Sequence, residues 1–350
     1  MKSFAQRLID WHEKHGRHDL PWQHPREPYR VWLSEIMLQQ TQVRTAIPYF
    51  LRFVEALPDV AALASAPSEQ VMALWSGLGY YARARNLHAA AKQCVELHGG
   101  RLPDDFDALL ALPGIGRSTA GAILAQAFNR RFAILDGNVK RVLTRWRGIG
   151  GFPGTPAIEK KLWELSESLL PETRLPDYTQ ALMDLGATLC TRTSPACESC
   201  PVRQDCVARI ENRTRELPAR KPSKTTPERE CAMVLAFDKH GRVLLERRDG
   251  KGVWNGLWSL PQAGDASHAA EHLSHYARFD SPPEILPRFA HVFSHYKLHI
   301  TPLRWNGVHA KTPVSDADST RWVAMDELDA LGLPSPVRKL LTSLIGSTTP

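Results

Sequence analysis

The sequence lacks the features that mark membrane and secreted proteins. No apolar run approaches the ~18 residues that a membrane-spanning helix needs, and the best one covers only residues 231–237. The amino-terminal stretch MKSFAQRLIDWHEKHG carries charges every few positions and has no apolar signal-peptide core. Cysteine is also scarce, with six in 350 residues. A secreted scaffold held by disulfides is therefore disfavoured.

The composition is that of a folded globular protein with a mild basic excess. Hydrophobic residues make up 43% and charged residues 23% of a chain whose 350 residues allow two or three domains. A net charge of +7 does not by itself indicate a nucleic-acid-binding protein. The basic density is highest from Arg130 to Arg147, where six basic residues are opposed only by Asp136. Such a run is typical of a phosphate-contacting face or of a solvated helix face, and charge alone leaves both open.

Hydrophobic periodicity divides the chain into three parts. Residues 1–212 have apolar residues at helical spacing and no βαβ alternation, so a mainly α domain is expected. Within it, PYRVWLSEIMLQQTQV is predicted to run helically from Pro28. Residues 213–230 hold three prolines and six basic residues, the composition of an extended linker. Residues 231–350 are predicted to form an α+β domain.

Three features predict the elements of this last domain. CAMVLAF and RVLLERR read as strands joined by a DKHG hairpin turn. HVFSHYKLHITPLRW reads as a second long β-type stretch, and VRKLLTSLI reads as a closing helix.

Four cysteines have the spacing C-x6-C-x2-C-x5-C and lie within seventeen positions: Cys190, Cys197, Cys200 and Cys206. The residues between them are mostly polar, so we interpret them as metal ligands rather than as buried packing. Four thiolates suit both zinc and an iron–sulfur cluster, and the spacing does not choose between the two. Cys94 and Cys231 are isolated and are expected to be structural.

A turn with two glycines, residues 112–120, is predicted to join two helices. Gly114 and Gly116 would let a ligand approach the backbone, and the amides that begin the next helix favour an anion. A single G-x-G is weak support, because it also fits a loop between packed helices. Asp136 follows at the start of the basic helix, where capping alone would explain it.

Together these motifs resemble the helix-hairpin-helix superfamily of DNA glycosylases. LPGIGRSTAGA is followed by an aspartate twenty residues after Gly116 and then by the four-cysteine cluster. SEIMLQQTQV, GLGYYARARNLH, ILDGNVKRVL and the additional C-terminal domain resemble the MutY-type adenine DNA glycosylases. The resemblance covers essentially the whole chain.

The resemblance implies a multidomain fold and a cofactor. A mainly α helix-hairpin-helix glycosylase domain, 1–212, would carry a cluster loop at 190–206. The linker 213–230 would lead to a Nudix-like domain, 231–350, that recognises 8-oxoguanine. The cofactor would be a [4Fe–4S] cluster on the four cysteines. The partner would be duplex DNA with adenine opposite 8-oxoguanine or guanine, bound by a monomer in the bacterial cytoplasm and nucleoid.

The resemblance also assigns the chemistry to two carboxyl groups with different duties. Glu35, whose helical neighbours form a largely apolar stripe, would protonate adenine, and desolvation would raise its pKa. Asp136 would stay ionised and stabilise the cationic sugar, or bond to it transiently. Asn138 would lie near the adenine. Ser118 stands where the endonuclease III relatives have a strand-nicking lysine, and a hydroxyl cannot form the Schiff base.

Base flipping would require contacts on both strands of the duplex. Gln40 and Thr41 match residues that probe the opposite base. Leu78, Gly79 and Tyr80 match a wedge that enters the base stack. The remaining matched contacts are with phosphate: Gly114, Gly116 and Lys140.

The C-terminal domain matches a domain that recognises the damaged base rather than a nucleotide hydrolase. GVWNGLWSLPQ resembles the opening of a Nudix-type fold, but the stretch after it has only Glu271 and no acidic row to hold Mg2+. The family's 8-oxoguanine loop matches Phe293, Ser294 and His295. His291, His295 and His299 would share one face of a strand, yet they have no Cys or carboxylate partner, so a metal there is not expected.

Three other functions compete with this interpretation. An endonuclease III-type glycosylase/lyase is disfavoured by Ser118 and by the extra domain. A DNA-binding module with a purely structural or electron-transferring cluster is disfavoured by Glu35 and Asp136. A Nudix hydrolase is disfavoured by its missing acids.

Overall fold

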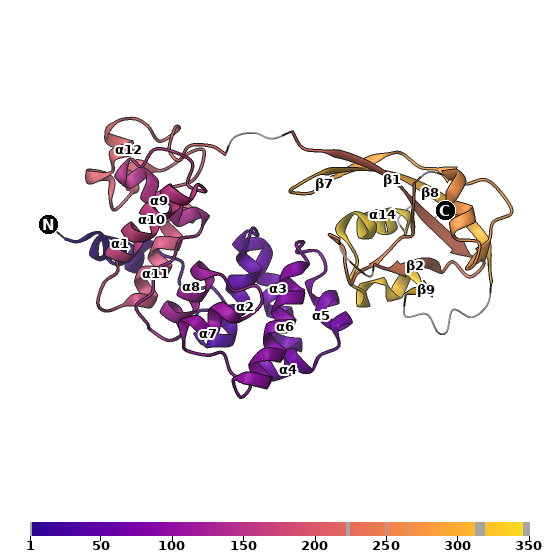
Figure 1. Ribbon diagram of the computed structural model, residues 1–350, viewed down its shortest axis with the longest axis horizontal. Helices are drawn as coiled ribbons and strands as arrows, with labels where there is room; N and C mark the ends of the chain where they lie inside the picture. Colours follow the sequence, from indigo (N-terminus) through magenta and orange to yellow (C-terminus); the bar gives the residue numbers. More distant parts are fainter. Residues whose placement is uncertain are drawn as a thin grey trace. The chain divides into compact units, whose positions relative to one another are not determined.

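The computed structural model describes residues 2–221, 225–248, 250, 252–264, 266–311 and 319–345. They fall into two compact units (Figure 1). The first contains Met1–Ser65 and Asn86–Ser223, and the second contains Ala66–Arg85 and Lys224–Pro350. Among the described residues, no helix combines the length and the apolar character that crossing a membrane requires.

The first unit is helical, as the periodicity predicts. Its elements, in chain order, are α1 (Phe4–His15), α2 (Pro28–Leu38), α3 (Val43–Ala56), α4 (Val60–Ser65), α6 (Ala82–Leu97, which begins in the second unit), α7 (Phe106–Ala111), α8 (Arg117–Ala127), α9 (Gly137–Arg147), α10 (Pro156–Ser168), α11 (Leu175–Asp184) and α12 (Val207–Ile210). A π-helical turn, Leu185–Leu189, and two short 3-10 turns, Cys197–Ser199 and Arg203–Asp205, shape the segment before α12.

The prediction of one helix through PYRVWLSEIMLQQTQV is wrong. α2 ends at Leu38, whose carbonyl accepts a hydrogen bond from the amide of Thr41 in a tight turn. Gln40 has a φ of 58°, a left-handed conformation that ends an α-helix. A new helix, α3, begins at Val43.

The linker is shorter than its composition suggests. Leu217 is buried, and its carbonyl and that of Thr214 accept hydrogen bonds from Arg145 on α9. The first unit therefore continues past residue 212, because the buried guanidinium of Arg145 needs these acceptors. At the other end, β1 already begins at Glu228.

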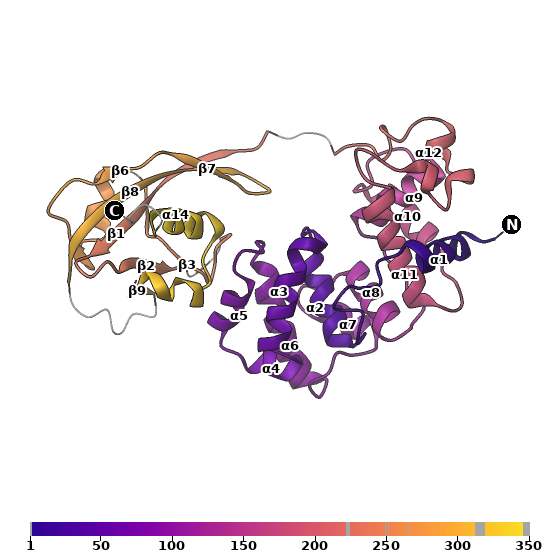
Figure 2. The ribbon, with the colours of Figure 1, turned by 180° about the vertical axis from the view of Figure 1, so that it is seen from behind.

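The second unit is a sheet with flanking helices. Besides α5 (Ser68–Trp75), its elements are β1 (Glu228–Asp238), β2 (Val243–Arg247), β3 (Trp258–Ser259), β4 (Gln262–Ala263), α13 (Ala266–His272), β5 (Ala277–Arg278), β6 (Glu284–Ile285), β7 (Phe289–Val292), β8 (Lys297–Ala310), β9 (Thr320–Val323) and α14 (Ser335–Ile345). The central strands β1 and β8 are parallel, and the main order is β3-β2-β1-β8-β5. Figure 2 shows α14 beside the central strands, seen from behind.

Two of the predictions for this domain are confirmed and one is corrected. β1 and β2 form the expected hairpin, and α14 is the expected closing helix. The stretch HVFSHYKLHITPLRW is not one strand but an antiparallel hairpin of β7 and β8, with Val292 paired to Lys297. The alternation of polar and apolar residues continues across the turn, so the sequence pattern does not show where one strand ends and the next begins.

Candidate active site and cysteine pocket

Glu35 lies on α2, where neighbouring residues shield most of its carboxyl group from water. The residues on either side of it, Ser34 and Ile36, are buried, while Glu35 itself keeps some exposed surface. The amide of Gln126, a buried residue of α8, donates a hydrogen bond to Glu35 Oε1 over 3.1 Å. Desolvation, reinforced by the charge of Asp136, raises the pKa of Glu35 to about 8 despite that bond.

Asp136 caps the N-terminus of α9. Its Oδ1 accepts a hydrogen bond from the amide of Val139 over 2.8 Å. Burial raises its pKa, while backbone amides and the cations Arg141 and Lys140 act against that rise. Among the residues that the structure describes, no cation lowers the pKa of Glu35 in this way, so Asp136 is the better site for the single negative charge of the pair.

Asn138 is held in place by the segment that leads to the first cysteine. Its Oδ1 accepts a hydrogen bond from Arg141 Nη2 over 2.8 Å. The same guanidinium donates to the carbonyls of Gly186 and Cys190, over 2.6 and 2.7 Å. A Cβ on Gly186 would lie 2.7 Å from the Cβ of Asn138, so only glycine allows this close packing.

Ser118 lies beside the irregular segment that leads to Asp136. Its hydroxyl oxygen accepts a hydrogen bond from the amide of Leu135 over 2.9 Å. The turn before it contains Gly114, with a φ of 82° and with Asn86 2.9 Å from where a Cβ would stand. Gly116 is the N-cap of α8, and nothing lies within 4 Å of the position its Cβ would take. The start of α8 therefore stays open to an anion.

The basic run from Arg130 to Arg147 is largely engaged within the protein. Lys140 pairs with Glu159 over 2.6 Å, and Arg130 pairs with Asp104 over 2.9 Å. Arg145 is buried and donates to carbonyls around the cysteine segment. Sequence density alone does not reveal these internal partners, and both interpretations of the run overlooked them.

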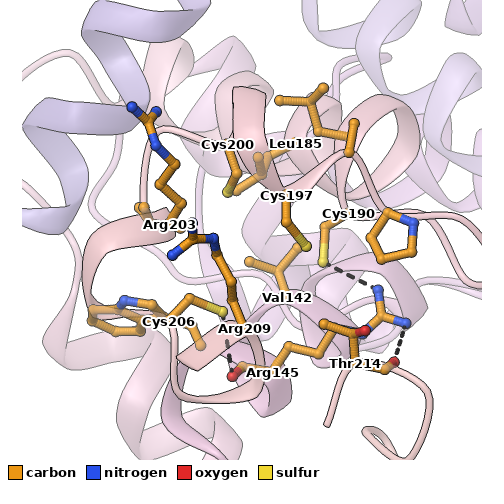
Figure 3. A pocket seen from close by; sticks show the side chains of 15 residues that line it. Val142, Arg145, Leu185, Cys190, Cys197, Cys200, Arg203, Cys206, Arg209 and Thr214 are labelled. Carbon is orange, nitrogen blue, oxygen red and sulfur yellow. Dashed lines mark hydrogen bonds between the residues drawn. The ribbon is translucent and has the colours of Figure 1, made fainter. Parts of the chain in front are cut away.

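The four cysteines of the C-x6-C-x2-C-x5-C motif line one pocket (Figure 3). Burial raises the pKa values of three thiols, that of Cys200 to about 12. Arg145 Nη1 lies 3.4 Å from Cys190 Sγ and supplies positive charge. Within the part of the chain that the structure describes, no three His, Cys, Asp or Glu side chains gather tightly enough to hold a single metal ion.

The residues matched to the opposite base and to the wedge lie on two turns with left-handed backbone. Gln40 and Tyr80 both have positive φ values, 58° and 51°, and both are exposed. Left-handed backbone costs a non-glycine residue roughly 1–3 kcal/mol, and it persists only where the surroundings impose it. Thr41 follows the first turn, and Leu78, which is buried, lies within the second.

The β7–β8 turn presents Ser294 and His295 at its exposed tip, with Ser294 Oγ 3.3 Å from His295 Nδ1. Phe293 anchors the turn through ring contacts with Trp254, His291 and Tyr296. The expected common face of three histidines is wrong, because His299 pairs with Ala290 and so faces away from His291, while His295 lies in the turn. His299 instead bonds Glu228 over 2.7 Å.

Comparisons with known proteins agree with this arrangement. Residues 33–168 match the HhH-GPD superfamily of base excision DNA repair proteins, and residues 232–343 match the NUDIX domain. The adenine DNA glycosylase of Buchnera aphidicola subsp. Acyrthosiphon pisum is 38% identical over 338 residues, which are 97% of this chain and 96% of that protein. The human adenine DNA glycosylase is 32% identical over 97% of this chain and 73% of its own length.

The chain belongs to the adenine DNA glycosylase family. A solved thermostable thymine-DNA glycosylase is similar to the helical part, with a TM-score of 0.55, 29% identity and coverage of 59% of this chain and 95% of that one. An endonuclease III–DNA complex has a TM-score of 0.51 at 21% identity, covering 61% of this chain and 95% of that one, a likeness of fold alone. The expected fold class of this adenine DNA glycosylase family member is thereby confirmed.

Two residues at the site of this adenine DNA glycosylase family member escaped the sequence analysis. Gln126 sits in an otherwise apolar helix, where a single amide carries no recognisable signal. Arg141 was counted only as one charge in a basic run, although it joins Asn138 to the cysteine segment.

Proposed function

We propose that this enzyme removes adenine mispaired with 8-oxoguanine or guanine by hydrolysing the N-glycosyl bond, without cutting the strand. The observation that carries the proposal is the carboxyl pair, in which Glu35 has a pKa of about 8 and interacts with the charge of Asp136. Adenine is a poor leaving group until a ring nitrogen is protonated, and the sugar then passes through a cationic state. A protonated Glu35 and an ionised Asp136 meet these two requirements.

The proton balance assigns a role to each side chain. Glu35 gives its proton to a ring nitrogen, the C1′–N9 bond breaks, and its electron pair leaves with adenine. The carboxylate of Asp136 stabilises the positive charge on the sugar. Water then adds to C1′, and its proton returns to the carboxylate pair. Gln126 orients Glu35 by its bond to Oε1, which leaves the other oxygen to carry the proton. Asn138, fixed by Arg141, orients groups beside the base.

Neither Ser118 nor Lys140 offers a free amine for cutting the strand. Ser118 is a hydroxyl that accepts from Leu135, and Lys140 is paired with Glu159. A strand-nicking reaction needs an amine that forms an imine with the sugar. The endonuclease III-type alternative is therefore less supported than simple hydrolysis.

The DNA contacts follow from the need to flip adenine out of the duplex. We place Gln40 and Thr41 against the opposite base. We place the turn of Leu78, Gly79 and Tyr80 in the base stack, with the exposed Tyr80 as the side chain that enters it, since Leu78 is buried. The open amides at the start of α8, beside Gly114 and Gly116, would bind a phosphate. Lys140 would contribute to the phosphate contact from its ion pair. The enzyme would act as a monomer on nucleoid DNA in the bacterial cytoplasm.

The C-terminal domain would recognise 8-oxoguanine. The exposed hydroxyl of Ser294 can both donate and accept, and the aromatic anchor of Phe293 holds it on a fixed hairpin with His295 beside it. The oxidised base differs from guanine at one carbonyl and one adjacent N–H, so a few hydrogen bonds must distinguish them.

The cysteine pocket fits a [4Fe–4S] cluster. Four thiols line one cavity, and burial raises the pKa values of Cys197, Cys200 and Cys206, so positive charge must compensate for their ionisation. They are not gathered tightly enough for a single ion in the described part of the chain, and a cluster body would fill the space between them. Bound through Cys190, Cys197, Cys200 and Cys206, the cluster would supply iron–thiolate bonds that order the 190–206 loop. Iron and sulfide should each approach four per chain.

The deciding experiment uses a duplex with adenine opposite 8-oxoguanine. Incubation with the enzyme followed by hot alkali should break the strand at the adenine, and incubation without alkali should leave it intact. Breakage before alkali would support the lyase alternative. Intact DNA after alkali would contradict the proposed function.

A further inference from the structure

Residues 66–85 lie early in the chain, yet they pack with the C-terminal domain in one compact unit. This segment comprises α5, the turn 76–80 and the start of α6. Helical periodicity and the family resemblance place the segment in the glycosylase domain, and they give the C-terminal domain only the recognition of 8-oxoguanine. Several contacts between residues 66–85 and the C-terminal domain instead fall on the residues that flank the turn 76–80.

The neighbours of the turn 76–80 hold it in a left-handed conformation, which strains Tyr80 but not its two glycines. Gly77, Gly79 and Tyr80 all have positive φ values, 105°, 75° and 51°. The carbonyl of Gly79 accepts from Trp75 Nε1 over 3.1 Å and from Arg83 Nη2 over 3.2 Å. Arg83 is buried and lies over the rings of Trp75 and Tyr80. Its packing fixes the base of the turn while Tyr80 stays exposed.

The backbone of Leu333 in the C-terminal domain forms hydrogen bonds with the residues at both ends of this turn. Ser76 Oγ donates to the Leu333 carbonyl over 3.0 Å and accepts from the Leu333 amide over 3.3 Å. The Tyr81 hydroxyl donates to the same carbonyl over 2.9 Å. Arg338 Nη2 on α14 adds a bond to Ser76 Oγ over 3.3 Å. Ser76, Tyr81 and Leu333 are all buried, so these bonds compete little with water.

A second group of contacts lies at the other end of α5. Glu69 accepts from Trp258 Nε1 over 2.5 Å and pairs with Arg321 over 2.8 Å. These bonds join the same two segments but do not touch the turn. They provide an internal control for the effect of docking as such.

We propose that the C-terminal domain holds the turn 76–80 in the conformation that enters DNA, with Ser76 and Tyr81 as the positioning residues. The inference rests on the proposed function, which places Leu78, Gly79 and Tyr80 in the base stack. It gives the C-terminal domain a second task, in extruding adenine, that is separate from its recognition of the opposite base. A left-handed Tyr80 needs such external support, because strain persists only where the surroundings impose it.

The test uses the full-length enzyme and a duplex with 2-aminopurine next to the target adenine, whose fluorescence rises when the base leaves the stack. Ser76→Ala removes the bonds to Leu333 and Arg338 with little change of volume. Tyr81→Phe, also nearly the same in volume, removes the bond to Leu333 and one that the hydroxyl accepts from the Gly77 amide over 3.4 Å. Each should slow extrusion and single-turnover excision about tenfold, the effect of roughly one to two hydrogen bonds. The ratio of excision opposite 8-oxoguanine to excision opposite guanine should not change, because both substrates need the same turn.

Glu69→Gln is the matched control, since it weakens the same interface without touching the turn. It should slow extrusion less than twofold. Equal slowing by Glu69→Gln and Tyr81→Phe would mean that docking as a whole is what matters, and the proposal would be wrong. Wild-type rates in both Ser76→Ala and Tyr81→Phe would also overturn it. If the wild-type enzyme neither extruded nor excised adenine, that result would instead contradict the proposed function. A melting curve on each variant separates a local effect from unfolding.

Discussion

The two carboxyl groups and the residues matched to DNA are supported in opposite ways. Glu35 stands on a regular helix and Asp136 at the start of one, and each accepts a hydrogen bond from a protein donor. Gln40 and Tyr80 instead stand on exposed turns with left-handed backbone. Acid–base chemistry requires a sheltered group with a shifted pKa, whereas entering a base stack requires a side chain that protrudes. The comparison shows that the same protein shields the carboxyl pair from water and holds the DNA-matched turns in strained backbone conformations.

The largest effect is expected from removing the acid. Glu35→Gln should lower single-turnover adenine excision by about 10²–10⁴-fold, because an amide cannot deliver the proton to the base. Binding of the mismatched duplex should stay within a few-fold of wild type, because the amide has the same shape. Gln126→Leu is a useful companion, since it removes only the bond to Glu35 and should cost far less. Near-normal excision by Glu35→Gln would remove Glu35 from the mechanism.

The lesion-reading hairpin should affect preference rather than chemistry. Replacing Phe293, Ser294 and His295 together by alanine should lower the preference for adenine opposite 8-oxoguanine over adenine opposite guanine by about one to two decades. This is the value of one hydrogen-bonded base contact, roughly 1–3 kcal/mol. Excision opposite guanine should change little. Ser294→Ala alone should have a smaller effect if backbone amides share the contact. Unchanged preference in single-turnover competition would place recognition elsewhere.

A gain of reactivity should follow from Ser118→Lys. The new amine would lie near the segment that carries Asp136, because Ser118 already bonds the amide of Leu135. It should form an imine with the sugar, so borohydride should trap more covalent complex than with wild type. Ser118→Met is a control of similar length without an amine. No added trapping would show that position 118 does not face the sugar.

The smallest effect concerns stability and its dependence on pH. The folded pKa of Glu35 is about 8 against an ordinary value of 4.5, so between these values the folded protein holds a proton that the unfolded chain has released. Unfolding then releases a proton, and wild-type stability falls as pH rises through this window. Glu35→Gln lacks this loss. The melting temperature of Glu35→Gln should therefore rise relative to that of wild type from pH 5 to pH 8. The rise should be roughly 2–4 °C for each kcal/mol of stability that wild type loses. A constant difference across that range would argue against the raised pKa.

Local patterns predicted what local physics controls. The helical first part, the β1–β2 hairpin and the closing helix follow from the periodicity of apolar residues, and the four cysteines stand out by spacing. The break at Gln40 and the turn between β7 and β8 were missed, because a turn inside a continuing pattern leaves no mark on the pattern. Gln126 and the role of Arg141 were missed because the partners lie far away in the chain, 91 residues for Gln126 and Glu35.

The sequence by itself determined the residue types, the family motifs and the order of the domains, since each depends on neighbours close in the chain. It also placed a carboxyl group on an apolar helical stripe, which is sufficient to predict the direction of its pKa. Only the tertiary structure decided that Asp136 lies near enough to raise that pKa further. It alone turned most of the basic run toward internal carboxylates and carbonyls. It also grouped residues 66–85 with the C-terminal domain. Burial, charge interaction and hydrogen bonding across such distances depend on how the helices and strands pack, which no local pattern specifies.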